Sequence, residues 1–377
     1  MTSMYTIVVG ISALLTMATS ACAQSANQAS HASRFENLAH QAEVARDAKR
    51  LDEALTLYKR ALELKPGWED GWGKAGSIAY ELEKYSECAS DFRRLTVLKP
   101  DFIPAWTLEG LCEYGLRDYR AALKSLTQVQ RLGFGENLEL SRAARLHLAL
   151  VLAKLGYSEK AIGWLYKLGE IEGKKTPEII VAAGIAALRK RWIPPEVPES
   201  ERDKVLKLGD AMATFMIGGD HKVAFDMFEA ALRDYPQEPN FHYRFGAFLL
   251  EGNFDRGIGE IKKTLDLEPD HVPALVALAR IHLRRGESQT ALPYAERAAK
   301  LSPVDIAARV TLGQVLLATG DTAGAVRELE LGVKLAPESP EVHYNLGSAY
   351  GRMGRKADAV RERQEFSRLR KSMDSRR

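Results

Sequence analysis

The sequence contains very little cysteine. Three cysteines occur in 377 residues, at positions 22, 88 and 112, which is too few for the disulfide framework of a small secreted domain. Cysteine and histidine do not cluster at the spacing of a structural zinc site. Cys88 and Cys112 both fall in apolar, helical segments, so we expect two buried thiols, and a disulfide between them is the alternative in an oxidising compartment.

An excess of charge of one sign is also missing. Lysine and arginine total 53 against 50 aspartate and glutamate residues, a formal net charge of +3. A nucleic-acid-binding protein concentrates positive charge on one face, and no basic block precedes the C-terminal segment, so we expect no nucleic-acid partner. Because 46% of the residues are hydrophobic and 27% are charged, the composition is that of a folded chain.

Recognisable catalytic motifs are absent. The sequence has no zinc-protease helix motif, no nucleophile elbow, no phosphate-binding Walker loop and no Cys-x-x-Cys pair. The glycines of Arg256–Gly259 lie in a helical pattern and are expected to serve packing. His147, His242 and His343 fall where they could line a groove, but no two histidines have close ligand spacing. We therefore expect no catalytic residues, no cofactor, no metal site and no enzymatic activity.

The first 33 residues contain no aspartate, glutamate, lysine or arginine. A mostly apolar run over 5–19 is followed by Ala21 and Ala23, which form the small-x-small pattern of a signal-peptidase site. This pattern predicts a signal peptide over 1–23, cleaved after Ala23, and a protein exported to the periplasm or secreted.

Two alternatives to cleavage remain open. Cys22 could be lipidated, which would make the protein a lipoprotein, or the apolar segment could stay uncleaved as an anchor. The apolar run is short for a membrane span of about 20 residues. A membrane is an expected partner only in these two cases.

A period of about 34 residues runs through the rest of the chain. Prolines recur at 33 or 34 residues in two series, Pro66 and Pro100, then Pro236, Pro269, Pro303 and Pro337. Two further series keep a step of 34, the glycines Gly252, Gly286, Gly320 and Gly354 and the alanines Ala291, Ala325 and Ala359. A fixed period of this length is the signature of a repeat architecture.

Each repeat predicts two helices. In one unit, apolar residues over 306–316 recur at helical spacing, and Gly320 ends that helix. A second helix follows over 323–335 and stops before Pro337, because proline cannot donate the helical hydrogen bond.

This pattern resembles the tetratricopeptide repeat. The matching residues are Ala54, Tyr58, Ala61 and Pro66 in one unit, Trp72, Gly76, Phe92 and Pro100 in another, and Leu346, Gly347, Tyr350, Gly354 and Ala359 in the last. The resemblance implies an all-α fold, a right-handed superhelical α-solenoid of antiparallel helix pairs. It also implies a non-catalytic protein–protein interaction scaffold. An accessory subunit of an envelope enzyme or transport complex is the alternative function.

The repeats divide the predicted chain into two arrays. After a flexible N-terminus over 24–33, an N-terminal array of about four repeats covers 34–173, and a C-terminal array of about five repeats covers 205–371. Residues 174–204 fit no full repeat, so they form either a degenerate repeat or a proline-rich hinge. Residues 372–377 are a basic tail.

The resemblance implies that the first helices of the repeats line a concave groove suited to a peptide or a helix. In the C-terminal array five polar residues fall at positions expected to face this groove, Arg244, Arg280, Arg284, Asn345 and Arg352. Arginine binds carboxylates in a bidentate fork, so these residues favour an acidic partner; solvated helix surface is the alternative. The N-terminal array is expected to have a more apolar groove at Leu108, Leu111, Leu146 and Leu150.

Overall fold

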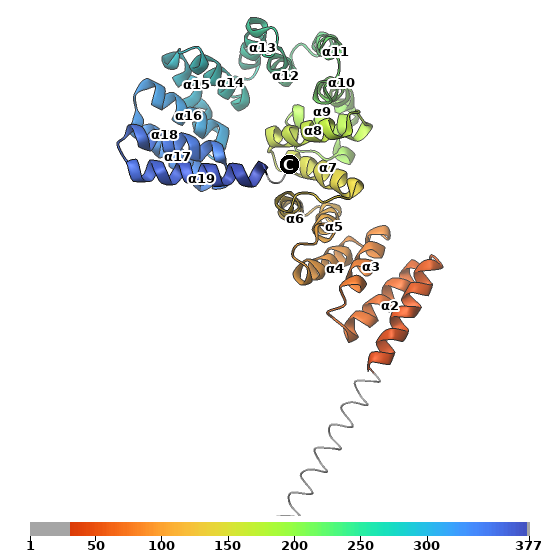
Figure 1. The fold of residues 1–377 in the computed structure, drawn as a ribbon. Coiled ribbons are helices and arrows are strands. Elements are labelled where there is room, and N and C mark those ends of the chain that lie inside the picture. The colour runs from red at the N-terminus through yellow and green to blue at the C-terminus, as the bar shows by residue number, and fades with distance from the viewer. Residues whose placement is uncertain (1–30, 375–377) are drawn as a thin grey trace, which may run out of the picture. The chain divides into compact units, whose positions relative to one another are not determined.

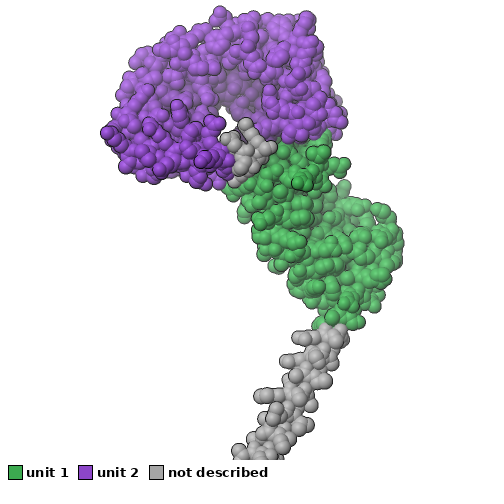
Figure 2. Space-filling model, viewed as in Figure 1, with its two compact units in different colours: residues 1–151 green, residues 152–377 purple. Residues whose placement is uncertain are grey.

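A computed structural model describes residues 31–374, and every regular element in that range is a helix (Figure 1). The predicted all-α solenoid of antiparallel helix pairs is confirmed. The chain divides into two compact units, unit 1 over 1–151 and unit 2 over 152–377 (Figure 2). The predicted signal peptide and its cleavage site lie outside the described residues. Of the helices that are described, none is both long enough and apolar enough to cross a bilayer.

Unit 1 is a series of helices joined by short turns, and the helices between residues 51 and 132 each pack against the next. The helices are one over 31–47, α2 (Leu51–Leu64), α3 (Glu69–Glu81), α4 (Tyr85–Leu98), α5 (Ile103–Gly115), α6 (Tyr119–Leu132) and most of α7 (Leu138–Lys154). Small residues such as Ala54 and Ala61 lie in the core beside Tyr58 and Phe92. The residues that carry the repeat pattern are therefore core residues.

A disulfide joins Cys88 of α4 to Cys112 of α5. Both side chains are fully buried, and their Cα atoms are 5.9 Å apart, within the usual range for a disulfide. The expectation of two separate thiols is thus wrong. Cys88 and Cys112 belong to successive repeats, and the packing of α4 against α5 brings them together.

Unit 2 continues the helix pairs and surrounds an open hollow in the space-filling view (Figure 2). Its elements after α7 are α8 (Ser158–Glu172), α9 (Pro177–Ala187), the short 3₁₀ helix η1 (Pro194–Glu196), α10 (Glu199–Met216), α11 (His221–Asp234), α12 (Pro239–Leu249), α13 (Phe254–Leu267), α14 (Val272–Arg284), α15 (Ser288–Leu301), α16 (Ile306–Thr319), α17 (Thr322–Leu335), α18 (Pro340–Arg352) and α19 (Lys356–Asp374). From α12 onward each odd-numbered helix packs against the even-numbered helix before it.

The segment over 174–204 contains α9 and the start of α10, which pack closely against each other. A Cβ atom added at Gly184 would lie 1.9 Å from the carbonyl oxygen of Val205, and one added at Gly209 would lie 2.0 Å from that of Ile180. The two backbones therefore touch at glycines, an approach that any side chain would prevent.

The division between the two compact units falls between Val151 and Leu152, inside α7. This division differs from the expected array boundary after residue 173. The reason is that α8 packs against α9 and α10 and so belongs with unit 2. The C-terminal array was expected to begin at residue 205, which lies within α10.

Candidate protein-binding cavities

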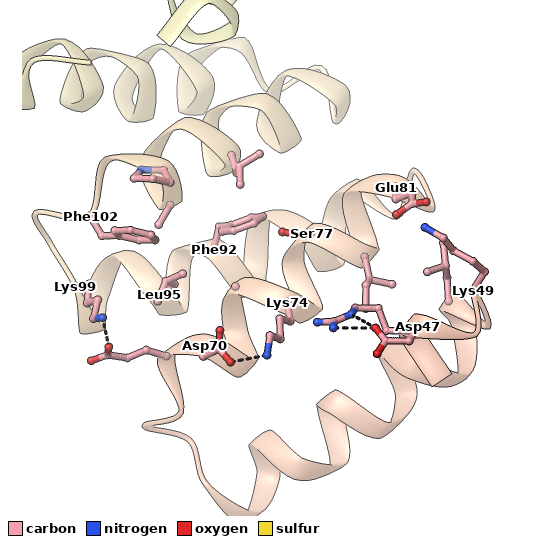
Figure 3. A pocket seen from close by; sticks show the side chains of 18 residues that line it. Asp47, Lys49, Asp70, Lys74, Ser77, Glu81, Phe92, Leu95, Lys99 and Phe102 are labelled. Carbon is pink, nitrogen blue, oxygen red and sulfur yellow. Dashed lines mark hydrogen bonds and ion pairs between the residues drawn. The ribbon is translucent and has the colours of Figure 1, made fainter. Parts of the chain in front are cut away.

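The first helices of several pairs line a cavity of about 920 Å³ in unit 1, here called the unit-1 cavity (Figure 3). Most of its charged side chains pair with one another. Lys74 lies 2.7 Å from Asp70 and 2.5 Å from Glu43, and Lys99 pairs with Glu69. These charges are already compensated within the protein.

The apolar part of the unit-1 cavity comes mainly from α4, α5 and the turn between them, with Leu51 of α2 and Ile78 of α3. Its residues include Phe92, Leu95, Phe102, Ala105 and Leu108. Of the four leucines expected to form an apolar groove, only Leu108 lines this cavity. The other three, Leu111, Leu146 and Leu150, are buried in the core.

A second cavity, of about 660 Å³, lies in unit 2 and is here called the unit-2 cavity. It is lined mainly by the first helices α12, α14 and α16. The apolar lining residues on α14 are Val272, Pro273, Val276, Ala277, Ile281 and Leu283. The polar and charged lining residues are Glu159, Tyr243, Arg280, Arg284, Asp305 and Gln314.

Two of the five predicted partner-binding residues lie side by side in the unit-2 cavity. Arg280 and Arg284 are one turn apart on α14 and both line the cavity. The Arg280 side chain is 48% exposed and donates a hydrogen bond to Glu341 at 3.2 Å. Arg284 is exposed and has no hydrogen-bond or ion-pair partner among the residues described. Both guanidinium groups can therefore be reached from solvent.

Arg244 lies behind the wall of the cavity and is only 5% exposed. Its guanidinium donates to both carboxylate oxygens of Glu159, at 2.7 and 2.9 Å. Its Nε atom also donates to the carbonyl oxygen of Ala187 at 3.4 Å. Glu159 lines the cavity and Arg244 does not, so the Glu159 carboxylate lies between the cavity and the Arg244 guanidinium.

Asn345 and Arg352 are not among the residues that line the cavity. The Asn345 amide, 7% exposed, donates to the carbonyl oxygen of Glu341 at 2.7 Å and accepts from Gln314 at 3.1 Å. Arg352 donates to the carbonyl oxygen of Leu317 at 2.7 Å. These two residues connect α18 to α16.

Tyr243 lies among several charges at the edge of the unit-2 cavity. Burial raises the pKa of its hydroxyl, and the Glu159 carboxylate raises it further. Arg244, Arg189 and Arg280 act in the opposite direction on the same pKa. The Tyr243 hydroxyl stays protonated at neutral pH. The positive charges of three arginines are felt at this hydroxyl.

The histidines expected near a groove are internal. The His242 ring contacts Glu260 at 2.7 Å and the carbonyl oxygen of Pro236 at 2.9 Å. His343 makes the equivalent contacts with Glu362 and Pro337, and His147 is bonded to the carbonyl oxygen of Ala143 at 2.8 Å. In the described part of the chain, no group of three or more potential metal ligands is close enough together to hold an ion.

Sequence models of the tetratricopeptide repeat match residues 107–171, 247–306 and 283–349. The chain contains tetratricopeptide repeats. The matched ranges include α14, which carries Arg280 and Arg284. No curated protein matches the chain at a significant level.

Several solved structures are similar to this chain over part of its length. MamA from Desulfovibrio magneticus RS-1 is 22% identical with a TM-score of 0.38, covering 45% of this chain and 94% of that one. YrrB, described as a tetratricopeptide protein with an unusual peptide-binding site, is 18% identical with a TM-score of 0.38; the match covers 45% of this chain and 88% of YrrB. The Cut9–Hcn1 hetero-tetramer of the APC/C is 12% identical with a TM-score of 0.41, covering 89% and 87%.

Proposed function

We propose that the protein is a non-catalytic scaffold that binds segments of other proteins in its first-helix cavities. One observation carries the proposal: in the unit-2 cavity the apolar surface of α14 lies directly beside Arg280 and Arg284. Grooves of this kind bind an amphipathic helix or an extended peptide through its apolar side chains. The two guanidinium groups select an acidic segment, because arginine pairs with carboxylates in a bidentate geometry.

Fluorescence anisotropy with designed peptides tests this proposal on the purified protein. The probe is a labelled 16-residue amphipathic peptide with leucines on one face and two glutamates spaced four residues apart. Its counterpart carries glutamine in place of both glutamates. We expect the glutamate peptide to bind more tightly, and Arg280→Glu with Arg284→Glu to weaken its binding about tenfold or more.

A double variant on α17 provides the matched control. Arg327→Glu with Lys334→Glu makes the same change in net charge at exposed positions that do not line the cavity. Its affinity should stay close to that of the unchanged protein. Equal affinities for all three proteins, or equal losses in both double variants, would contradict binding in the unit-2 cavity.

We also propose that the protein is exported. The Cys88–Cys112 disulfide supports this proposal, because structural disulfides persist mainly in oxidising compartments. The uncharged N-terminal segment with its small-x-small site adds independent support. Intact mass after fractionation tests it: a chain beginning at Gln24 indicates cleavage, and a lipid adduct on Cys22 indicates a lipoprotein. A full-length chain in which both Cys88 and Cys112 are free thiols would contradict export.

A further inference from the structure

We propose that Glu159 holds the place of a partner's carboxylate in the unit-2 cavity, and that an acidic ligand displaces it from Arg244. The inference rests on the proposed binding of an acidic segment in this cavity. It adds an internal competitor, which sets how tightly such a segment binds.

The geometry of Glu159 is that of a ligand bound in an arginine site. Its two oxygens accept one hydrogen bond each from the Arg244 guanidinium, at 2.7 and 2.9 Å. The Arg244 side chain is 5% exposed, whereas that of Glu159 is 49% exposed and lines the cavity. A carboxylate from solvent can therefore approach Arg244 only at the position that Glu159 now occupies.

The helices that carry the two residues do not form a packed pair. α8 packs against α9 and α10, and α12 packs mainly against α13. Glu159 and Arg244 are 85 positions apart in the chain. The Glu159 side chain can therefore turn away from Arg244 without separating any packed pair of helices.

The charges around Arg244 favour replacement of Glu159 by another carboxylate over movement of Glu159 away from Arg244 without a replacement. A buried guanidinium without a partner is strongly unfavourable, and Arg189 and Arg280 act on Tyr243 beside it. Withdrawal of Glu159 would leave this group of arginines with less compensating negative charge. An incoming carboxylate restores the ion pair with Arg244 and also reaches Arg280. The added interaction with Arg280 supplies the free energy for the exchange.

The test is a gain of affinity in the Glu159→Gln variant, measured by anisotropy with the glutamate peptide. Glutamine keeps the size of the side chain but removes the charge that competes for Arg244. We expect about tenfold tighter binding, the range contributed by one charge-assisted hydrogen bond. Binding of the glutamine peptide should not change.

Glu229→Gln is the matched control. Glu229 of α11 pairs with Arg256 of α13 at 2.7 Å, and neither residue lines the cavity. Neutralisation of Glu229 should leave the affinity unchanged. If Glu229→Gln tightened binding as much as Glu159→Gln, a general loosening of unit 2 would explain the gain and the inference would be lost.

Two further results separate this inference from the proposed function. If the unchanged protein binds the glutamate peptide and the Arg280 and Arg284 variant does not, the proposed function stands; unchanged or weaker binding by Glu159→Gln then overturns only the inference. If neither the unchanged protein nor Glu159→Gln binds, both are overturned. If Glu159→Gln does not fold, Glu159→Asp takes its place. The shorter aspartate side chain weakens the ion pair with Arg244 and should give a smaller gain in affinity for the glutamate peptide.

Discussion

The indole nitrogen of Trp72 donates a hydrogen bond to the carbonyl oxygen of Pro66, six residues earlier, at 2.8 Å. The same bond recurs at four further repeats with different donors, from Trp106 to Pro100, His242 to Pro236, Arg309 to Pro303 and His343 to Pro337, at 2.8 to 2.9 Å. In each case the donor lies on a first helix and the acceptor is the proline that ends the preceding repeat. This bond fixes the turn between successive repeats.

Replacement of Trp72 by phenylalanine removes this donor and keeps an aromatic ring. We expect a loss of about 1 kcal/mol in the free energy of unfolding, the usual net contribution of such a bond. Urea unfolding monitored by circular dichroism measures it. Trp106→Phe removes the equivalent bond to Pro100 and should have a similar effect; no change in either variant would show that the bond does not stabilise the turn.

The Cys88–Cys112 disulfide should stabilise unit 1. It closes a loop with a sequence separation of 24, for which chain entropy predicts about 3 kcal/mol. Replacement of both cysteines by alanine should lower the urea midpoint by a corresponding amount. Reductant should lower the midpoint of the unchanged protein and have no effect on the variant. If reductant does not change the urea midpoint of the unchanged protein, the disulfide does not stabilise unit 1.

Gly184→Ala should destabilise unit 2. The new Cβ atom would lie 1.9 Å from the carbonyl oxygen of Val205, so α9 and α10 must move apart. Overpacking of this kind lowers stability by about 1–3 kcal/mol, which exceeds the gain of up to about 1 kcal/mol in helix propensity. Thermal unfolding should show a lower midpoint.

Gly163→Ala on α8 is the control for this prediction. A Cβ atom at Gly163 meets nothing within 4 Å, so only the gain in helix propensity remains. This variant should be slightly more stable than the unchanged protein. Similar midpoints for Gly163→Ala and Gly184→Ala would contradict the close approach of α9 and α10.

Acid should destabilise unit 2 through His271. Burial, with help from Arg189 and Arg244, lowers the pKa of this histidine to about 3. In the fold its Nδ1 atom accepts a hydrogen bond from the Ala274 N–H at 3.1 Å. The unfolded chain takes up the proton below a pKa of about 6.5, whereas the folded chain does not until about 3. The contribution to stability is therefore complete above about 6.5 and is lost as pH falls towards 3.

The measurement is the free energy of unfolding between pH 7.5 and 4.5 for the protein and for His271→Asn. Asparagine can also accept a hydrogen bond at the start of a helix, but it does not titrate. The unchanged protein should lose up to about 1.4 kcal/mol more per pH unit than the variant below pH 6.5. His242 opposes this trend: burial lowers its pKa, but bonds to Glu260 and Pro236 raise it above the ordinary value. Since His242 is present in both proteins, parallel profiles would rule out His271 as the cause.

The repeat pattern predicted the helix pairs because their signals are local. Gly286, Gly320 and Gly354 end first helices with φ of +77°, +99° and +76°, a left-handed turn that glycine adopts without strain. In unit 1 the same turn is made by Lys49, Glu83 and Arg117, with φ of +61°, +55° and +60°. Glycine spacing marks these turns only in the second half of the chain, although the turn itself recurs in both.

Local spacing also places Arg280 and Arg284 on one face of α14, because residues four apart on a helix are neighbours. The same reasoning treated Arg244 as equivalent to them, and it gave no sign of Glu159. Whether a first-helix residue faces a cavity or lies behind its wall depends on how far the array bends, and no single repeat contains that information.

The sequence by itself determined the two-helix repeat, its period and the small residues that let helices approach, because each is a pattern within one repeat or the recurrence of that pattern along the chain. Only the tertiary structure decided that Cys88 meets Cys112 and that Glu159 binds Arg244. Cys88 and Cys112 are 24 residues apart but lie in successive repeats, and Glu159 and Arg244 are 85 residues apart. In both pairs, packing between different repeats brings the partners together. Small rotations between successive repeats accumulate along a solenoid, so contacts at long range are set by their sum and not by the pattern of any one unit.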